Sequence, residues 1–83
     1  MDPKEILRKQ FLKVVNNQLR DNEPPITAIT LDRLIQEGYK EADAKQLIAV
    51  CVGATFFDVV NKNEAFDLIR YEALLKKLPQ LPE

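Results

Sequence analysis

Histidine and tryptophan are absent from this 83-residue chain, which also holds one cysteine and only two glycines. The missing histidine removes the side chain that most often serves in acid–base catalysis and in binding transition metals. Two glycines leave no glycine-rich loop that could cradle a phosphate. A single cysteine cannot form a disulfide within the chain, which suits a reducing compartment. We therefore expect no enzyme, no catalytic residue, no metal site and no cofactor.

The remaining reactive side chains do not change that expectation. Cys51 lies in an apolar run without a nearby cation to lower its pKa, so we interpret it as a small core residue. The acidic residues are scattered and match no calcium-binding loop. Asp58 follows two phenylalanines on an apolar face, and if buried it needs a donor, which Arg70 or Tyr71 could supply. A surface-facing Asp58 is the alternative.

The composition indicates a globular chain, with 46% hydrophobic and 30% charged residues. The uncharged apolar run from Leu47 to Phe57 is much shorter than the roughly 20 residues needed to cross a bilayer. No apolar leader follows Met1, so we expect a cytoplasmic protein. The net charge of −1 gives no overall attraction to nucleic acid or to an anionic membrane.

Hydrophobic periodicity predicts an all-α fold, a compact four-helix domain that occupies residues 1–83 and frays from about residue 79. Asp2 and Pro3 are typical of a helix start, and Pro24 with Pro25 must end that helix. Thr30 is the predicted N-cap of the next helix, after a loop over 23–29. The predicted helices lie near residues 3–22, 31–37, 41–61 and 68–77.

The third of these helices is expected to be apolar and central. Its hydrophobic residues cover more than half of the circumference, as in a helix packed on several sides. Gly53 is costly in a helix, by about 1 kcal/mol relative to Ala, which indicates close approach of another helix or chain; a kink is the alternative. Gly38 is predicted to end the preceding helix in the left-handed conformation.

A surface for another protein, or for a second copy of the chain, is the favoured function. Asn17, Gln18 and Arg20 lie beside the Pro24-Pro25 segment, where a rigid loop could present fixed hydrogen-bonding groups. Tyr39 is an aromatic residue of the kind enriched at interfaces, although core packing is the favoured role for it. We take these four residues as candidate partner-binding residues.

The alternative function is a helix-turn-helix-like regulator associated with nucleic acid. A short helix from Thr30, a turn at Gly38 and a following helix have that order. Glu41 and Asp43, however, stand where a recognition helix would approach phosphates, so nucleic acid is the less favoured partner.

Several residues have a characteristic order and spacing along the chain: Asn17-Gln18-Leu19, Pro24-Pro25, Thr30-Leu31, Arg33-Leu34, Gly38-Tyr39, Ala44, Ile48, Phe66-Asp67, Tyr71 and Leu74. This pattern resembles a bacterial family of small helical domains of unknown function. The family often carries histidines where this chain has Leu12 and Gln46, so any chemistry of those histidines is missing here. The resemblance covers roughly residues 12–75 and implies a compact helical fold and a bacterial, cytoplasmic origin, but no activity.

Overall fold

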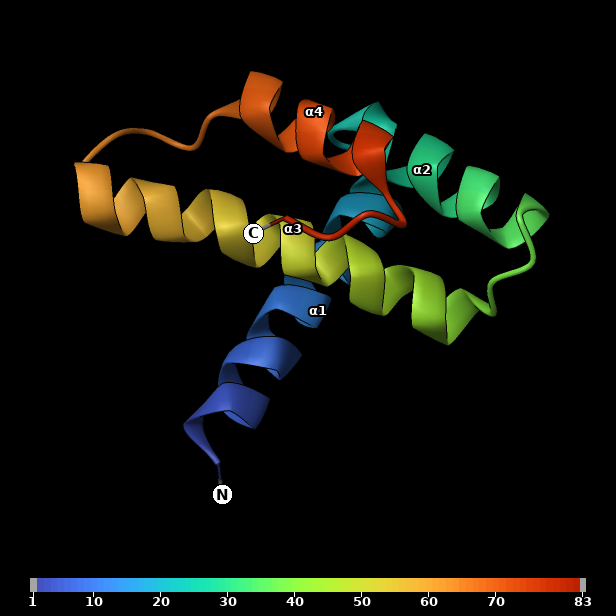
Figure 1. The fold of residues 1–83 in the computed structure, drawn as a ribbon, viewed down its shortest axis with the longest axis horizontal. Helices are drawn as coiled ribbons and strands as arrows, with labels where there is room; N and C mark the ends of the chain where they lie inside the picture. Colours follow the sequence, from blue (N-terminus) through green and yellow to red (C-terminus); the bar gives the residue numbers. More distant parts are fainter. Residues whose placement is uncertain (1, 83) are drawn as a thin grey trace.

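The computed structural model describes residues 2–82, which form four α-helices and no strand (Figure 1). The all-α fold is therefore confirmed. In Figure 1, α1 crosses α3 steeply, and its N-terminal half extends beyond the body of the molecule. The helices are α1 (Pro3–Asp21), α2 (Pro25–Gln36), α3 (Glu41–Lys62) and α4 (Leu68–Lys77).

Two helices begin at the aspartates that suit an N-cap. The Asp2 carboxylate accepts a hydrogen bond from the backbone N–H of Lys4 at 3.0 Å, with Pro3 in the first turn. The Asp67 carboxylate accepts from the backbone N–H of Arg70 at 3.1 Å. In both cases a side chain satisfies a donor that the first helical turn leaves without an intrahelical partner.

The second helix begins six residues earlier than the sequence predicts. Pro24 is extended, and Pro25 occupies the first helical position, where its missing N–H costs nothing. The predicted loop over 23–29 and the predicted N-cap at Thr30 are therefore wrong, because Thr30 is a buried residue inside α2. A Pro-Pro pair ends one helix and, at its second proline, starts the next.

Gly38 has the predicted role at the end of α2. Its φ of +106° lies in the region that only glycine adopts without strain. The N–H of Gly38 donates to the carbonyl of Ile35, and the N–H of Tyr39 donates to the carbonyl of Leu34. These two bonds form a Schellman motif, which satisfies the last carbonyls of the helix and turns the chain toward α3.

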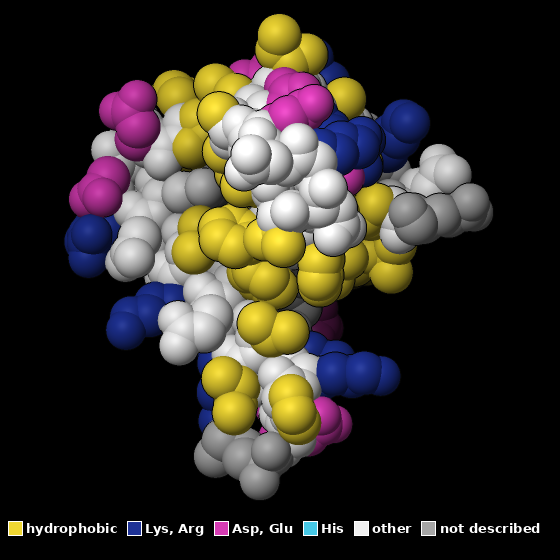
Figure 2. Space-filling view, turned by 90° about the vertical axis from the view of Figure 1, so that its left-hand side faces the viewer, with side chains coloured by type: hydrophobic (Ala, Val, Ile, Leu, Met, Phe, Trp, Pro, Cys, Tyr) yellow, Lys and Arg dark blue, Asp and Glu magenta, His cyan; other side chains and the backbone are white. Residues whose placement is uncertain are grey.

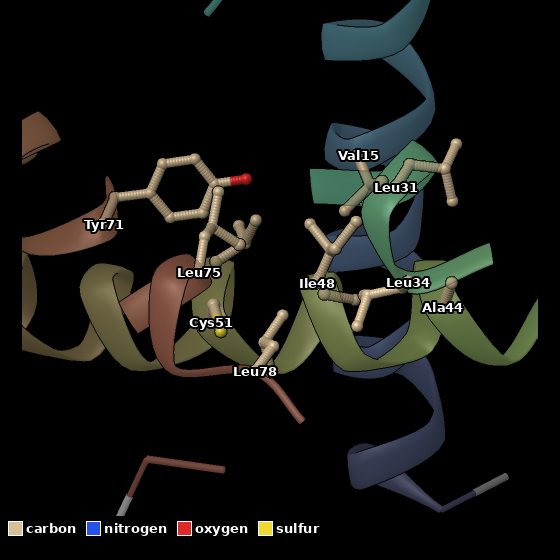
Figure 3. Close-up of a cluster of buried hydrophobic side chains, with 11 residues drawn as sticks. Val15, Leu31, Leu34, Ala44, Ile48, Cys51, Tyr71, Leu75 and Leu78 are labelled. Atoms are coloured by element: carbon tan, nitrogen blue, oxygen red, sulfur yellow. The ribbon is translucent and has the colours of Figure 1, made fainter. Parts of the chain in front are cut away.

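Helix α3 contacts each of the other three helices and supplies much of the core. Figure 3 shows Ile48 and Cys51 of α3 among side chains from α1, α2 and α4. The most enclosed core residues include Val15, Leu34, Ile48, Cys51, Val52, Tyr71 and Leu75.

The apolar run of α3 is not buried along its whole length, contrary to expectation. Val50, Phe56 and Phe57 are 44%, 50% and 55% exposed. The other three helices are too few and too short to cover every face of a 22-residue helix. Among residues 2–82, no helix has the combined length and apolarity that crossing a membrane requires.

Candidate functional site

A groove of about 520 Å³ lies between the N-terminal half of α1 and one face of α3. Its lining is mainly apolar, and the C-terminal tail reaches its edge at Pro82. Its volume falls within the roughly 300–1,000 Å³ typical of ligand-binding sites. Its apolar lining includes Leu7, Phe11, Val50, Ala54 and Phe57.

Gly53 lies where α1 crosses α3. A Cβ atom at this position would stand 3.0 Å from Cε2 and 3.1 Å from Cδ2 of the Phe11 ring. The predicted close approach of another helix is therefore confirmed, and it comes from α1 of the same chain. The Phe11 ring also packs at a tilt on Phe56, with 6.1 Å between the ring centroids. Phe11 thus lines the groove where the two helices cross.

The rest of the groove stays open to solvent. Leu7 is 46% exposed on α1, and Val50 and Phe57 are half exposed opposite it. Residues 2–10 are exposed throughout, so this half of α1 has one side on the groove and no covering element. Figure 2, seen from the side where α3 ends, shows hydrophobic side chains across the middle of the face and again on the protruding end of α1.

Charged groups stand around this apolar floor. Lys4 and Arg8 border the groove from α1, and Asp58 and Arg70 border it from α3 and α4. The Arg70 guanidinium pairs with the Asp58 carboxylate, which is 24% exposed. Asp58 is thus partly buried and forms an ion pair with Arg70 of the last helix, one of the two partners that the sequence offers it. Within residues 2–82, no carboxylate lies within 4.0 Å of the amino or guanidinium nitrogens of Lys4 or Arg8.

Gln18, a candidate partner-binding residue, is instead part of a polar cluster inside the molecule. Its Oε1 accepts hydrogen bonds from the hydroxyls of Thr27 at 2.8 Å and Tyr71 at 2.9 Å. The two hydroxyls are 3.2 Å apart. Burial raises the pKa of Tyr71 to about 12, so this hydroxyl stays protonated at neutral pH. The cluster links α1, α2 and α4, and Gln18 has no acceptor free for a partner.

The other three candidate residues do not reach the groove. Asn17 is exposed on α1, and Arg20 is exposed and paired with Asp21 at 3.0 Å. This pairing raises the pKa of Arg20 and lowers that of Asp21. Tyr39 is partly buried and packs on the core from the turn after α2. Asn17 and Arg20 remain available on the surface, while Tyr39 has the core role that the sequence left open.

The sequence did not single out Leu7, Val50 and Phe57 as functional residues. The signal that could have found Phe57 is its position outside the two apolar stripes of α3. One stripe consists of Ala44, Leu47, Ile48, Cys51, Thr55 and Val59, and the other consists of Val52, Phe56 and Val60. Leu7 lies in the apolar stripe of α1, and only the crossing angle of α1 on α3 shows that the stripe has no partner there. That angle depends on the contact between Gly53 and Phe11, which periodicity does not reveal.

The described residues provide neither a reactive thiol nor a group of side chains placed to hold a metal ion. Burial raises the pKa of the Cys51 thiol to about 11, so it is protonated and a poor nucleophile at neutral pH. Among the described side chains, no group of three or more His, Cys, Asp or Glu is placed to hold a metal ion. Leu12 and Gln46 line a separate hollow of about 240 Å³ between α1 and α3.

Comparison with known proteins found no family model, no curated protein and no solved structure that matches this chain. The resemblance to a bacterial family of helical domains stays a prediction. The function is therefore inferred from the geometry of the groove.

Proposed function

We propose that this chain is a small, non-enzymatic, cytoplasmic interaction module that binds another protein, or a second copy of itself, in the groove between α1 and α3. The observation that carries the proposal is the half exposure of Leu7, Val50 and Phe57 around one continuous groove. Contiguous apolar surface with charged groups at its edge is typical of interaction sites on soluble proteins. Leaving it uncovered forgoes roughly 25 cal/mol for each Å² that a partner could bury.

Gly53 no longer favours a second chain. The sequence allowed that a partner helix approaches this glycine, but the Phe11 ring of the same chain already fills the space. Support for a partner therefore comes from the open part of the groove and not from the crossing point. A homodimer remains one form of the proposal, since nothing in the groove's shape alone distinguishes a second copy from another protein.

Site-specific photo-crosslinking tests the proposal in cells that naturally make the protein. A benzophenone side chain is placed at Val50 in the groove and, as a control, at Ile69, which is 82% exposed on α4 and does not line the groove. We expect one discrete adduct from Val50 that is missing from Ile69, and Leu7→Glu should abolish it. An adduct with twice the mass of the chain identifies a second copy.

Three results of the crosslinking experiment would contradict the proposal. Absence of any adduct from Val50, or the same set of adducts from Val50 and Ile69, contradicts a docking role for the groove. A folded Leu7→Glu variant that still gives the adduct contradicts it as well. Circular dichroism of each variant shows whether the helices are retained.

The nucleic-acid alternative stays a prediction with less support. Glu41 and Asp43 are exposed in the first turn of α3, where they would repel phosphates. Binding of duplex DNA at low salt that weakens steeply as salt is added would restore this alternative.

A further inference from the structure

The open side of the groove indicates the shape of its occupant. Two helices form its walls, and the apolar positions of α3 that line it recur about one turn apart, at Val50, Gly53, Ala54 and Phe57. A helix can lay its apolar face along such a surface, with side chains one turn apart entering between the walls. A small apolar molecule would keep much of its own surface wet here, whereas ligand sites bury about 70–90% of a ligand. A helical segment is the better fit.

The charged side chains at the edge of the groove indicate the sign of the charge that its occupant carries. Asp58 is engaged by Arg70, so the ion pair contributes little net charge toward an incoming chain. Lys4 and Arg8 remain on the α1 side, and within residues 2–82 no carboxylate pairs with either of them. An occupant with carboxylates beside its apolar face would complement these two cations, and a basic occupant would be repelled.

The same charges disfavour a second copy of the chain in this groove. A two-fold dimer presents the same surface from both subunits. If its axis runs across the groove, α1 of one subunit faces α1 of the other, and Lys4 and Arg8 then lie opposite the same two cations. Residues 1–22 carry five Lys/Arg against three Asp/Glu, so the rest of α1 does not reverse this sign. Like charges facing each other across an interface cost affinity.

We infer that the groove between α1 and α3 binds an acidic amphipathic helix of another protein, whose apolar face covers Leu7, Val50 and Phe57 and whose carboxylates pair with Lys4 and Arg8. This inference rests on the proposed function and names the chemical class of the partner.

A displayed peptide library tests the inference on the full chain. The peptides are helix formers of about four turns with a fixed apolar stripe, and the positions beside the stripe are encoded equally as Glu or Lys. They are selected on the folded protein near physiological salt, with the Val50→Glu variant used to remove peptides that bind elsewhere. We expect the selected peptides to carry Glu beside the stripe in clear excess over Lys.

A charge-reversal pair then locates the contact. Arg8→Glu should weaken binding of the best selected peptide by about tenfold, because it replaces attraction by repulsion at the groove. Lys9→Glu is the matched control, since it makes the same change in charge one residue further along, outside the groove lining. It should change the affinity by less than about twofold, since exposed charges away from the contact are screened by salt.

The outcomes separate this inference from the proposed function. Selected peptides that prefer Lys, or that show no preference, overturn the acidic partner while the Val50 adduct still supports docking. Equal effects of Arg8→Glu and Lys9→Glu also overturn it. A dimer in sedimentation that Val50→Glu dissociates replaces the helix by a second copy. Failure to select any peptide overturns the inference, and if the Val50 adduct is also missing, the proposed function falls with it.

Discussion

At the scale of single residues, the cluster of Gln18, Thr27 and Tyr71 holds three helices together through one carbonyl oxygen. Thr27 and Tyr71 are fully buried, so each hydroxyl would be costly without a partner. Gln18 Oε1 accepts from both hydroxyls, which satisfies two buried donors at once. A sequence gives little sign of this arrangement, because the three residues are far apart along the chain and none is unusual alone.

The Tyr71 hydroxyl should contribute measurably to stability. Tyr71→Phe removes one hydrogen bond and leaves Thr27 bonded to Gln18, so we expect the free energy of unfolding to fall by about 1 kcal/mol. Tyr39→Phe is the matched control, because no described hydrogen bond involves its hydroxyl, and it should change stability by less than about 0.5 kcal/mol. Urea denaturation measures both. Equal effects of the two variants would show that the buried cluster adds nothing.

Gly53 is required by the ring that lies on it. Gly53→Leu should displace Phe11 and lower the free energy of unfolding by about 1–3 kcal/mol, as overpacking does. The cost should shrink in the double variant with Phe11→Ala, because the two positions are in contact. Ala73→Leu, at an exposed position of α4, serves as the control. Additive effects of the Gly53 and Phe11 changes would contradict the contact.

At the scale of helices, Arg33 of α2 caps the end of α4. Its guanidinium donates to the carbonyls of Leu75 at 2.9 Å and Leu78 at 3.0 Å, and to the Glu37 carboxylate at 2.8 Å. The final carbonyls of a helix have no intrahelical donor, and a cation there also interacts favourably with the helix dipole. Leu78, just beyond α4, is thereby held in the core, at 2% exposure.

Removing this cap should loosen the end of α4 in particular. Arg33→Gln is expected to lower the free energy of unfolding by about 1–2 kcal/mol, since hydrogen bonds to a charged group exceed neutral ones. Amide exchange should speed up most in the last turn of α4. Arg20→Gln removes an exposed pair with its neighbour Asp21 and should cost at most about 0.5 kcal/mol. Unchanged exchange in α4 would refute the capping role.

The helices show which local signals in the sequence are sufficient to predict where a helix begins and ends, and which are not. The first, third and fourth helices begin and end within a residue of their predicted bounds, and the second helix ends within a residue of its own. Asp2 and Asp67 act locally as N-caps, and Gly38 acts locally after the end of the second helix. The start of the second helix is mispredicted, because threonine is a residue type preferred at N-caps, whereas Thr30 lies inside the helix. The Asp58–Arg70 pair was foreseen as an option, whereas the groove depends on how α1 crosses α3.

At the scale of the whole molecule, stability should fall at alkaline pH. Burial raises the pKa of Cys51 to about 11 and that of Tyr71 to about 12. Both groups are neutral when protonated, so the unfolded chain, with its lower pKa values, loses protons first as the pH rises. The stabilisation is complete below about pH 9 and is lost as the pH passes through the two folded-state values.

Thermal or urea unfolding measures this loss. Between pH 8 and pH 10.5 the free energy of unfolding should fall by roughly 2–3 kcal/mol from these two groups together. Cys51→Ala should be less stable at pH 8, because it leaves a cavity, and should lose less between the two pH values. A Cys51→Ala variant with the same alkaline loss as the original chain would show that the buried thiol does not contribute.

The most direct test of the docking account is a map of backbone amide chemical shifts when the partner captured at Val50 is added to the isotope-labelled chain. The account predicts that the largest shifts fall on Leu7, Arg8, Val50 and Phe57, on both walls of the groove. Shifts concentrated on Asn17 to Asp21, or on the turn around Tyr39, with the groove unchanged, would contradict it.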